Sequence, residues 1–270
     1  LMTTQSIASI IPFDVKEVRQ EGGMYYGQNA VSHNMILYNR LTDLNPNGCI
    51  LGMPGSGKSF AAKREMINVL LNTDDEIYVI DPEREYKVLA DAFGGSTVKI
   101  AAGSDVFINP FDINLENSDD AGDPIKVKSD FIETIVEIMV GGKFGLSPIE
   151  KSIIGRSVIN IYEPYLQRLK KKGLSQDPEH APTLVEFYND LVHQPQGEAV
   201  NLALSLERYV KGALDVFSHR TNVKVDKRFV VYDIKDIGAG LKELGLQIAL
   251  DNIWNRMIEN RQKGKRTWFY

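Results

Sequence analysis

Apolar residues in the first half of the chain form short runs that alternate with longer segments at helical spacing. Three of the runs predict buried strands, and the two segments between them predict amphipathic helices. The expected strands are residues 49–51, 77–80 and 97–101, and the expected helices are residues 58–71 and 84–93. This order predicts a parallel sheet with right-handed crossovers. Ahead of it, residues 24–26 and 35–38 predict two strands joined by a polar turn.

Helical patterns replace strands after Pro110. Capping boxes that begin at Ser147 and Thr183 mark two helix starts, and the glycine pair at 141–142 marks a helix end. The helices of this region are expected at residues 129–140, 149–169, 183–192 and 199–210. Strand character returns at residues 228–232, and a helix over residues 241–260 and a last strand over residues 267–270 follow.

The segment 52–59, Gly-Met-Pro-Gly-Ser-Gly-Lys-Ser, carries the clearest chemistry, because it matches G-x-x-x-x-G-K-[ST] in full. Its glycines allow backbone N–H groups to surround a phosphate, and the helix after it directs its positive end at the same place. A glycine turn that only joins a strand to a helix is the alternative. We expect ATP or ADP with Mg²⁺, and Ser59 as the metal ligand. The residues expected to bind the nucleotide are Gly52, Pro54, Gly55, Ser56, Gly57, Lys58, Ser59 and Phe60.

The predicted fold class is therefore α/β, a RecA-like P-loop domain with a mostly parallel sheet and an inserted all-α helical region. We expect residues 25–115 and 222–270 to form the nucleotide-binding domain, residues 116–221 the all-α insertion, and residues 1–24 a lead-in segment. The chain stops in the aromatic, β-prone run Thr-Trp-Phe-Tyr, so we expect a fragment of a longer protein whose nucleotide-binding domain is incomplete at its C-terminus.

A P-loop hydrolase also needs carboxylates at strand ends, for the magnesium and for the attacking water. The strand over residues 77–80 ends in Asp81, with Glu83 and Glu85 after it, and the strand over residues 228–232 ends in Asp233, with Asp236 after it. The strand over residues 267–270 is a third place for such a residue, and the residues alone do not rank the three.

Pro82 should keep Asp81 extended at the C-terminal edge of a strand beside the P-loop strand. The alternative is that these carboxylates only support the start of the next helix. We assign catalytic roles to Lys58, Asp81 and Glu83.

Four segments resemble the ATPase domain of the VirB-type traffic ATPases of conjugative type IV secretion systems, in the HerA–FtsK superfamily of P-loop motor ATPases. They are residues 52–60, 79–86 (Val-Ile-Asp-Pro-Glu-Arg-Glu-Tyr), 108–112 (Ile-Asn-Pro-Phe-Asp) and 232–236 (Tyr-Asp-Ile-Lys-Asp). The resemblance runs from Tyr25 to Tyr270, and its second and third segments are more specific than the P-loop. It implies that Asp81 and Glu83 lie close to the phosphates. It also implies that the family's magnesium aspartate and catalytic glutamate follow a strand like residues 267–270, beyond this chain.

The resemblance further implies an ATP-driven motor that powers type IV secretion or conjugative transfer of DNA or protein. Such a motor is expected to be a homo-oligomer, a hexamer when full length, in the cytoplasm at the inner face of the cell membrane. Its expected partners are the inner-membrane and other ATPase components of the secretion system, and DNA stays open as a partner. Two alternatives remain: a DNA-translocating or DNA-processing motor of the same superfamily, and a nucleotide-gated assembly scaffold without turnover.

Composition narrows these expectations. A net charge of −5 argues against a broad nucleic-acid surface, and the sequence has no apolar run of the ~18 residues that a membrane span needs. The single cysteine, Cys49, is expected to be a buried thiol, and the four histidines lack the spacing of a zinc site. The basic cluster at residues 168–172 fits helix capping, with a phosphate or acidic-membrane contact as the alternative. Trp254 and Trp268 are expected in the core.

Overall fold

The computed structural model describes residues 17–115, 123–223 and 225–270 and divides the chain into two compact units, Leu1–Asp74 (unit 1) and Asp75–Tyr270 (unit 2). Most of the expected lead-in segment, residues 1–16, lies outside the described residues. The same holds for residues 116–122, at the expected start of the all-α insertion.

Unit 1 contains a two-stranded antiparallel ribbon and one helix. Strands β1 (Met24–Gln28) and β2 (Met35–Tyr38) form the ribbon, which confirms the expected hairpin, and the 3-10 turn η1 (Arg40–Thr42) follows. Helix α2 (Lys58–Asn72) closes the unit and buries Met66 and Val69 completely. The sequence pattern thus predicted both the ribbon and the helix of unit 1.

Residues 49–51 do not form the expected strand. They lack regular structure and are exposed, as is the thiol of Cys49, and no strand of the described residues pairs with them. A strand is stable only where a neighbour satisfies its N–H and C=O groups. Apolar character alone therefore did not suffice to predict a strand here, and the expectation of a buried thiol is wrong.

Unit 2 is built on a four-stranded parallel sheet with the order β4-β5-β3-β6. Its strands are β3 (Glu76–Asp81), β4 (Ser96–Lys99), β5 (Phe229–Asp233) and β6 (Thr267–Phe269). Strand β3 pairs with β5 on one side and β6 on the other. Because a strand has only two edges, the expectation that the strand of Asp81 lies beside a P-loop strand is wrong.

Six helices accompany this sheet within the described part of unit 2. They are α3 (Lys87–Ala92), α4 (Pro124–Val140), α5 (Pro148–Lys172), α6 (Leu184–His193), α7 (Gly197–Val210) and α8 (Lys242–Gln262). Both expected capping boxes are present, Ser147 with Glu150 at α5 and Thr183 with Glu186 at α6. Helix α3 begins at Lys87 rather than at residue 84, because Arg84 has a φ of +62°, which no α-helix contains.

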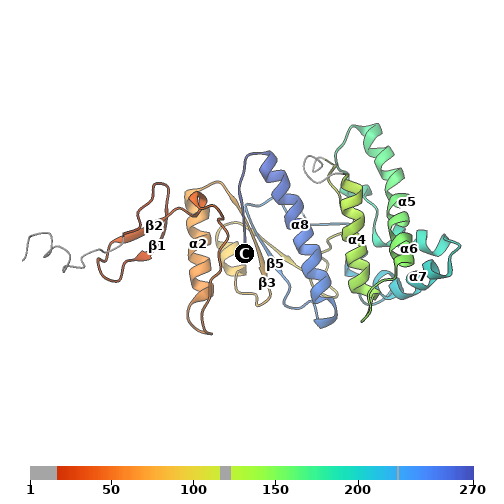
Figure 1. Ribbon diagram of the computed structural model, residues 1–270, viewed down its shortest axis with the longest axis horizontal. Helices are drawn as coiled ribbons and strands as arrows, with labels where there is room; N and C mark the ends of the chain where they lie inside the picture. Colours follow the sequence, from red (N-terminus) through yellow and green to blue (C-terminus); the bar gives the residue numbers. More distant parts are fainter. Residues whose placement is uncertain (1–16, 116–122, 224) are drawn as a thin grey trace, which may run out of the picture. The chain divides into compact units, whose positions relative to one another are not determined.

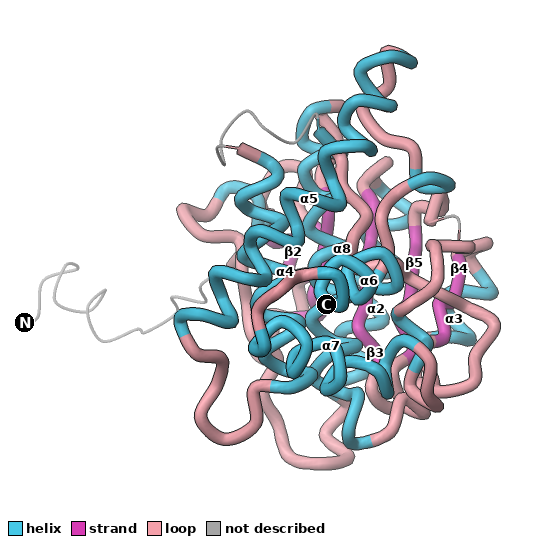
Figure 2. The backbone as a smooth tube through the Cα atoms, turned by 90° about the vertical axis from the view of Figure 1, so that its right-hand side faces the viewer, coloured by secondary structure: helices cyan, strands magenta, loops and turns pink. Residues whose placement is uncertain are grey.

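Helices α4–α7 follow β4 in the chain, precede β5, and lie together beside α8 (Figure 1). Viewed from their side, they stand in front of the strands (Figure 2). One hydrophobic core joins the sheet to these helices and includes Tyr78, Tyr232, Ile132, Ile154 and Phe187. The mixed α/β architecture with a parallel sheet and a helical stretch between its strands agrees with the predicted fold class. No helix of the described residues is long and apolar enough to cross a bilayer.

Helix α8 packs against β3 and β6 and buries Leu244 and Ile248. Trp254, expected in the core, is 61% exposed. At 100° per residue, position 254 is turned about 140° away from the buried Ala249 around the helix, whereas position 253 is turned only about 40° away. Ile253 occupies the core-facing position instead.

Candidate functional site

The loop over residues 52–59 has the backbone that a phosphate-binding loop requires. Gly55 and Gly57 have φ angles of +80° and +89°, in the left-handed region that other residues rarely adopt. At Gly52 an added Cβ would lie 2.3 Å from the Oγ of Ser56. Gly55 and Gly57 are thus needed for this loop conformation, as the motif predicted, and a residue other than glycine at position 52 would require the Ser56 hydroxyl to move.

Helix α2 begins immediately after this loop with an open N-terminus. Its N-cap residue is Gly57, and within the described residues no side chain caps the helix and its first turn holds no carboxylate. The first N–H groups of a helix have no partner inside the helix, and the helix dipole places positive charge there. This N-terminus can therefore donate hydrogen bonds to an anion.

Two side chains with suitable chemistry stand at this N-terminus. Lys58 and Ser59 are half-buried, and the Nζ of Lys58 donates a hydrogen bond to the Met53 carbonyl at 3.0 Å. The ammonium thus folds back over the loop. Backbone N–H groups, a lysine and a hydroxyl form the donor set that suits a nucleotide phosphate with Mg²⁺. The side chains of Pro54 and Phe60, also expected at the nucleotide, are exposed.

The β-ribbon of unit 1 holds α2 through polar contacts. Glu65, 6% exposed on α2, accepts a hydrogen bond from the Tyr26 hydroxyl and pairs with Arg40 at 2.9 Å. Burial and the hydrogen bond to Glu65 raise the pKa of Tyr26 to about 12. Asn68 donates to the Tyr25 carbonyl at 3.1 Å. The helix that carries Lys58 is therefore fixed by the ribbon rather than by its own N-cap.

Two of the predicted carboxylates of unit 2 end adjacent strands of the sheet. Asp81 ends β3, Asp233 ends β5, and the two residues are direct partners in the parallel register. Asp81 is 1% exposed, and its two oxygens accept the N–H groups of Glu83 at 3.2 Å and Tyr86 at 2.8 Å. The two aspartates therefore lie side by side, and the carboxylate of Asp81 stabilises the loop after β3 through these two hydrogen bonds.

Arg84 connects this loop to the end of β5, a contact that the sequence pattern did not suggest. Its Nε donates to Asp233 at 2.5 Å, and its Nη2 donates to Asp236 at 2.5 Å. Lys99, at the end of β4, also pairs with Asp236 at 2.9 Å. Hydrogen bonds from Arg84 and Lys99 lower the pKa of Asp236 to about 2, and the same network raises the pKa of Arg84. The only feature of the sequence that could have pointed to this contact was a cation beside several acids along the chain.

Glu83 differs from Asp81, because within the described part of the chain its backbone is held by hydrogen bonds and its carboxylate is not. Its N–H is held by Asp81, and its carbonyl accepts a hydrogen bond from the Nζ of Lys235 at 3.2 Å. Its side chain is exposed, and among the described residues nothing pairs with its carboxylate. A free carboxylate on a fixed backbone can accept a proton, orient a water molecule or bind a cation.

Residues 109–112 of the third resembling segment, 108–112, link the sheet to the helices. Asn109 donates to the Pro182 carbonyl at 2.8 Å, and Thr221 donates to Asp112 at 2.5 Å. Two helices reach the same segment, because Lys128 of α4 donates to the Pro110 carbonyl and Tyr162 of α5 to the Phe111 carbonyl. The segment is thus a junction between the end of β4 and the helices.

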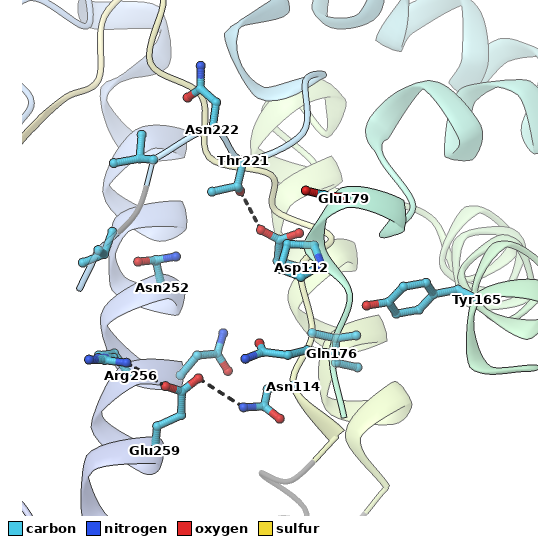
Figure 3. A pocket seen from close by; sticks show the side chains of 15 residues that line it. Asp112, Asn114, Tyr165, Gln176, Glu179, Thr221, Asn222, Asn252, Arg256 and Glu259 are labelled. Atoms are coloured by element: carbon cyan, nitrogen blue, oxygen red, sulfur yellow. Dashed lines mark hydrogen bonds and ion pairs between the residues drawn. The ribbon is translucent and has the colours of Figure 1, made fainter. Parts of the chain in front are cut away.

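A cavity of about 540 Å³ lies beside this junction, between α8 and residues 112–114, 176–179, 221–223 and 225 (Figure 3). Its charged lining residues are three carboxylates, of Asp112, Glu179 and Glu259, and the guanidinium of Arg256. Burial raises the pKa of Asp112, although a hydrogen bond from Thr221 opposes this. The excess of carboxylates disfavours a phosphate, so this cavity is not a second nucleotide site. The described residues contain no cluster of metal-binding side chains.

Comparisons with known proteins match part of the chain to one family and nearly all of it to one fold. Residues 42–136 match the family described as "Helicase HerA, central domain", a range that includes the glycine loop, Asp81, Glu83 and the junction. No curated protein matches the chain. Among solved structures the chain is similar to VirB4 of Thermoanaerobacter pseudethanolicus, with a TM-score of 0.74 and 22% identity over 92% of this chain and 67% of that chain. At this identity the likeness shows a shared fold.

Proposed function

We propose that the chain is a HerA-type P-loop ATPase and belongs to a motor that powers type IV secretion or conjugative transfer of DNA or protein, because residues 42–136 match the HerA central domain and the chain has the fold of VirB4. The observation that carries the proposal is the uncapped N-terminus of α2 directly behind the glycine loop. The nucleotide-binding part comprises residues 25–115 and 222–270, and residues 116–221 are its all-α insertion.

Residues of unit 1 bind the nucleotide in this proposal. The N–H groups of residues 52–59 surround the phosphates, and Lys58 donates to the β- and γ-phosphates. The Ser59 hydroxyl holds Mg²⁺, which neutralises phosphate charge when bound. The donor set described above fits ATP and ADP, with Gly52, Gly55 and Gly57 allowing the close approach.

Glu83 is the residue of unit 2 that we propose to act in turnover, as the group that orients the attacking water or accepts its proton. The proposal rests on its free carboxylate, since both oxygens of Asp81 are engaged by backbone N–H groups. Asp81 contributes to the same reaction by holding the loop of Glu83. Lys58, Asp81 and Glu83 thus keep the catalytic assignment, with different roles.

We further propose that the full-length protein works as a homo-oligomer, a hexamer, because hydrolysis by motors of this class uses residues from two subunits. Its place is the cytoplasmic face of the inner membrane, beside the other ATPase and membrane components of the secretion system. A partner that binds only the ATP-loaded form would explain how turnover drives assembly or transfer.

The decisive test compares three variants of the full-length protein, Lys58→Ala, Glu83→Gln and Asp81→Asn. Binding of a fluorescent ATP analogue and release of phosphate are measured with the melting temperature. We expect Lys58→Ala to weaken binding or turnover about tenfold or more, and Glu83→Gln to lower kcat about tenfold with unchanged binding. Lys170→Ala, at an exposed lysine of α5, is the control. Parent-like binding and turnover in Lys58→Ala would refute the nucleotide site.

A DNA-translocating or DNA-processing motor is the second candidate, favoured by the family match, whose description names a helicase. Single- and double-stranded DNA added to the ATPase assay distinguishes the two functions. Stimulation of kcat by DNA alone supports the DNA motor. Stimulation that requires components of the secretion system supports the first proposal.

A further inference from the structure

The loop over residues 82–86 is held by its backbone, and this gives it a defined shape at the C-terminal edge of the sheet. Asp81 binds the N–H groups of Glu83 and Tyr86, and Lys235 binds the carbonyl of Glu83. The N–H and the carbonyl of Glu83 are therefore both fixed. Its side chain extends from a backbone that cannot easily turn.

Arg84, the next residue, has a backbone conformation that is unusual for its type. Its φ of +62° lies in the left-handed region, where the Cβ of a residue other than glycine is crowded. Such a conformation persists where surrounding contacts enforce it, and these positions cluster at functional sites. The contacts that enforce it here belong to the side chain of Arg84.

The guanidinium of Arg84 bridges two carboxylates that follow β5. It meets Asp233 through Nε at 2.5 Å and through Nη2 at 3.4 Å, and it meets Asp236 through Nη2 at 2.5 Å. The side chain of Asp233 is 4% exposed, so this carboxylate needs a charged partner, whereas Asp236 is 42% exposed. The forked guanidinium binds Asp233 through two nitrogens while it also meets Asp236, an arrangement that the single nitrogen of a lysine cannot reproduce.

We propose that Arg84 is a positioning residue, whose bridge to Asp233 and Asp236 sets the direction of the Glu83 carboxylate and thereby the rate of ATP turnover. This inference rests on the proposed role of Glu83. Arg84 itself touches neither nucleotide nor water in the reaction. Without the bridge only the contacts of Asp81 and Lys235 hold the loop, and the carboxylate of Glu83 then spends less time in its productive orientation.

This mechanism predicts a separation of kcat from KM. Nucleotide binding depends on residues 52–59, which the bridge does not include. We therefore expect Arg84→Gly to lower kcat about tenfold or more and to leave the KM for ATP within about twofold. Glycine is the informative replacement, because it adopts a φ of +62° without strain and so removes the bridge while it permits the loop shape.

Two further variants and a control complete the experiment in the full-length protein. Arg84→Lys should give an intermediate kcat, because an ammonium keeps the charge but loses the two-nitrogen contact with Asp233. Asp236→Asn should lower kcat about threefold, because it removes the exposed half of the bridge and keeps the buried half. Lys87→Gln, at an exposed lysine three residues along the chain, should behave as the parent. Hydrogen exchange of residues 83–86 should be faster in the Arg84 and Asp236 variants and unchanged in Lys87→Gln.

The outcomes separate this inference from the proposed function. If Glu83→Gln and Lys58→Ala are impaired while Arg84→Gly keeps the kcat of the parent, the positioning role is refuted and the proposed function stands. If Glu83→Gln and Lys58→Ala both turn over ATP as the parent does, the proposed function fails. If Arg84→Gly does not fold, Asp236→Asn decides, and an unchanged kcat in that variant refutes the inference.

Discussion

Replacing Glu76 with glutamine should weaken unit 2 more than any other change of a single charge at the start of its sheet. Glu76 begins β3 and is 3% exposed. Its carboxylate accepts hydrogen bonds from Asn260 at 2.8 Å, Tyr78 at 2.8 Å and Arg256 at 3.2 Å. It thus joins the first residue of the central strand to the last turns of α8.

The loss in the free energy of unfolding follows from the partly buried charge of Arg256, which loses Glu76 as its partner. Breaking a buried ion pair by removing one partner costs about 3–5 kcal/mol. Arg256 is 24% exposed and also pairs with Glu259 at 2.9 Å, so water and Glu259 compensate part of its loss. The lower end of the range, about 3 kcal/mol, is therefore expected. For a unit of this size, the melting temperature should fall by about 6–12 °C.

The effect should depend on pH in one direction. Burial alone would raise the pKa of Glu76, but hydrogen bonds from Asn260 and Tyr78 and the charge of Arg256 outweigh it, so the pKa lies below its ordinary value. Because the folded pKa is the lower one, the stabilisation is complete above the ordinary pKa and is lost as the pH falls through the folded pKa. The difference between Glu76→Gln and the parent should thus be largest near pH 7 and shrink below about pH 4.

Urea unfolding followed by tryptophan fluorescence measures this difference. Both tryptophans of the chain, Trp254 and Trp268, lie in unit 2, so the signal reports on that unit. Glu163→Gln, at an exposed position of α5, is the matched control and should change the free energy of unfolding by less than about 0.5 kcal/mol. A Glu76→Gln variant as stable as this control at pH 7 would refute the reasoning.

Two further variants test other parts of the structure. Asp251→Asn leaves the ammonium of Lys128, 5% exposed, without its carboxylate at 2.9 Å, so the free energy of unfolding in urea should fall by about 3 kcal/mol. Lys128→Met, which removes the buried charge itself, should cost less, and equal losses would contradict the reasoning. Gly57→Ala places a Cβ at a φ of +89°, so binding of a fluorescent ATP analogue should weaken several-fold, and unchanged binding would contradict the assigned loop conformation.

Local signals in the sequence predicted local structure well. The capping boxes at Ser147 and Thr183 identified the starts of α5 and α6, because a cap and the N–H groups that it satisfies lie within one turn. The glycines of residues 52–59 predicted the loop for the same reason, since each φ is set by the residue itself. Prediction from sequence was reliable where the interacting groups are neighbours in the chain.

Interactions between distant residues were the part that the sequence could not supply. Arg84 and Asp233 are 149 positions apart, and the helical pattern around Arg84 favoured a helix start that the long-range ion pair overrides. Residues 49–51 have the composition of a strand, yet a strand also needs a partner, which composition does not specify. The sequence predicted that Asp81 and Asp233 end two strands of the sheet, and the structure places them at one edge. Which carboxylate stays free depends on how the loop after β3 folds back, and composition does not specify this.

The junction at residues 109–112 has a mechanical consequence for a motor. Its buried polar groups find their partners on α4, on α5 and at residues 182 and 221, so the helices cannot move away from the end of β4 without leaving those groups unsatisfied. A load applied to α4 or α5 therefore reaches the end of β4 directly through Pro110 and Phe111, with little slack between them. The helical stretch of unit 2 behaves as a stiff lever on the sheet, rather than as an appendage on a flexible tether.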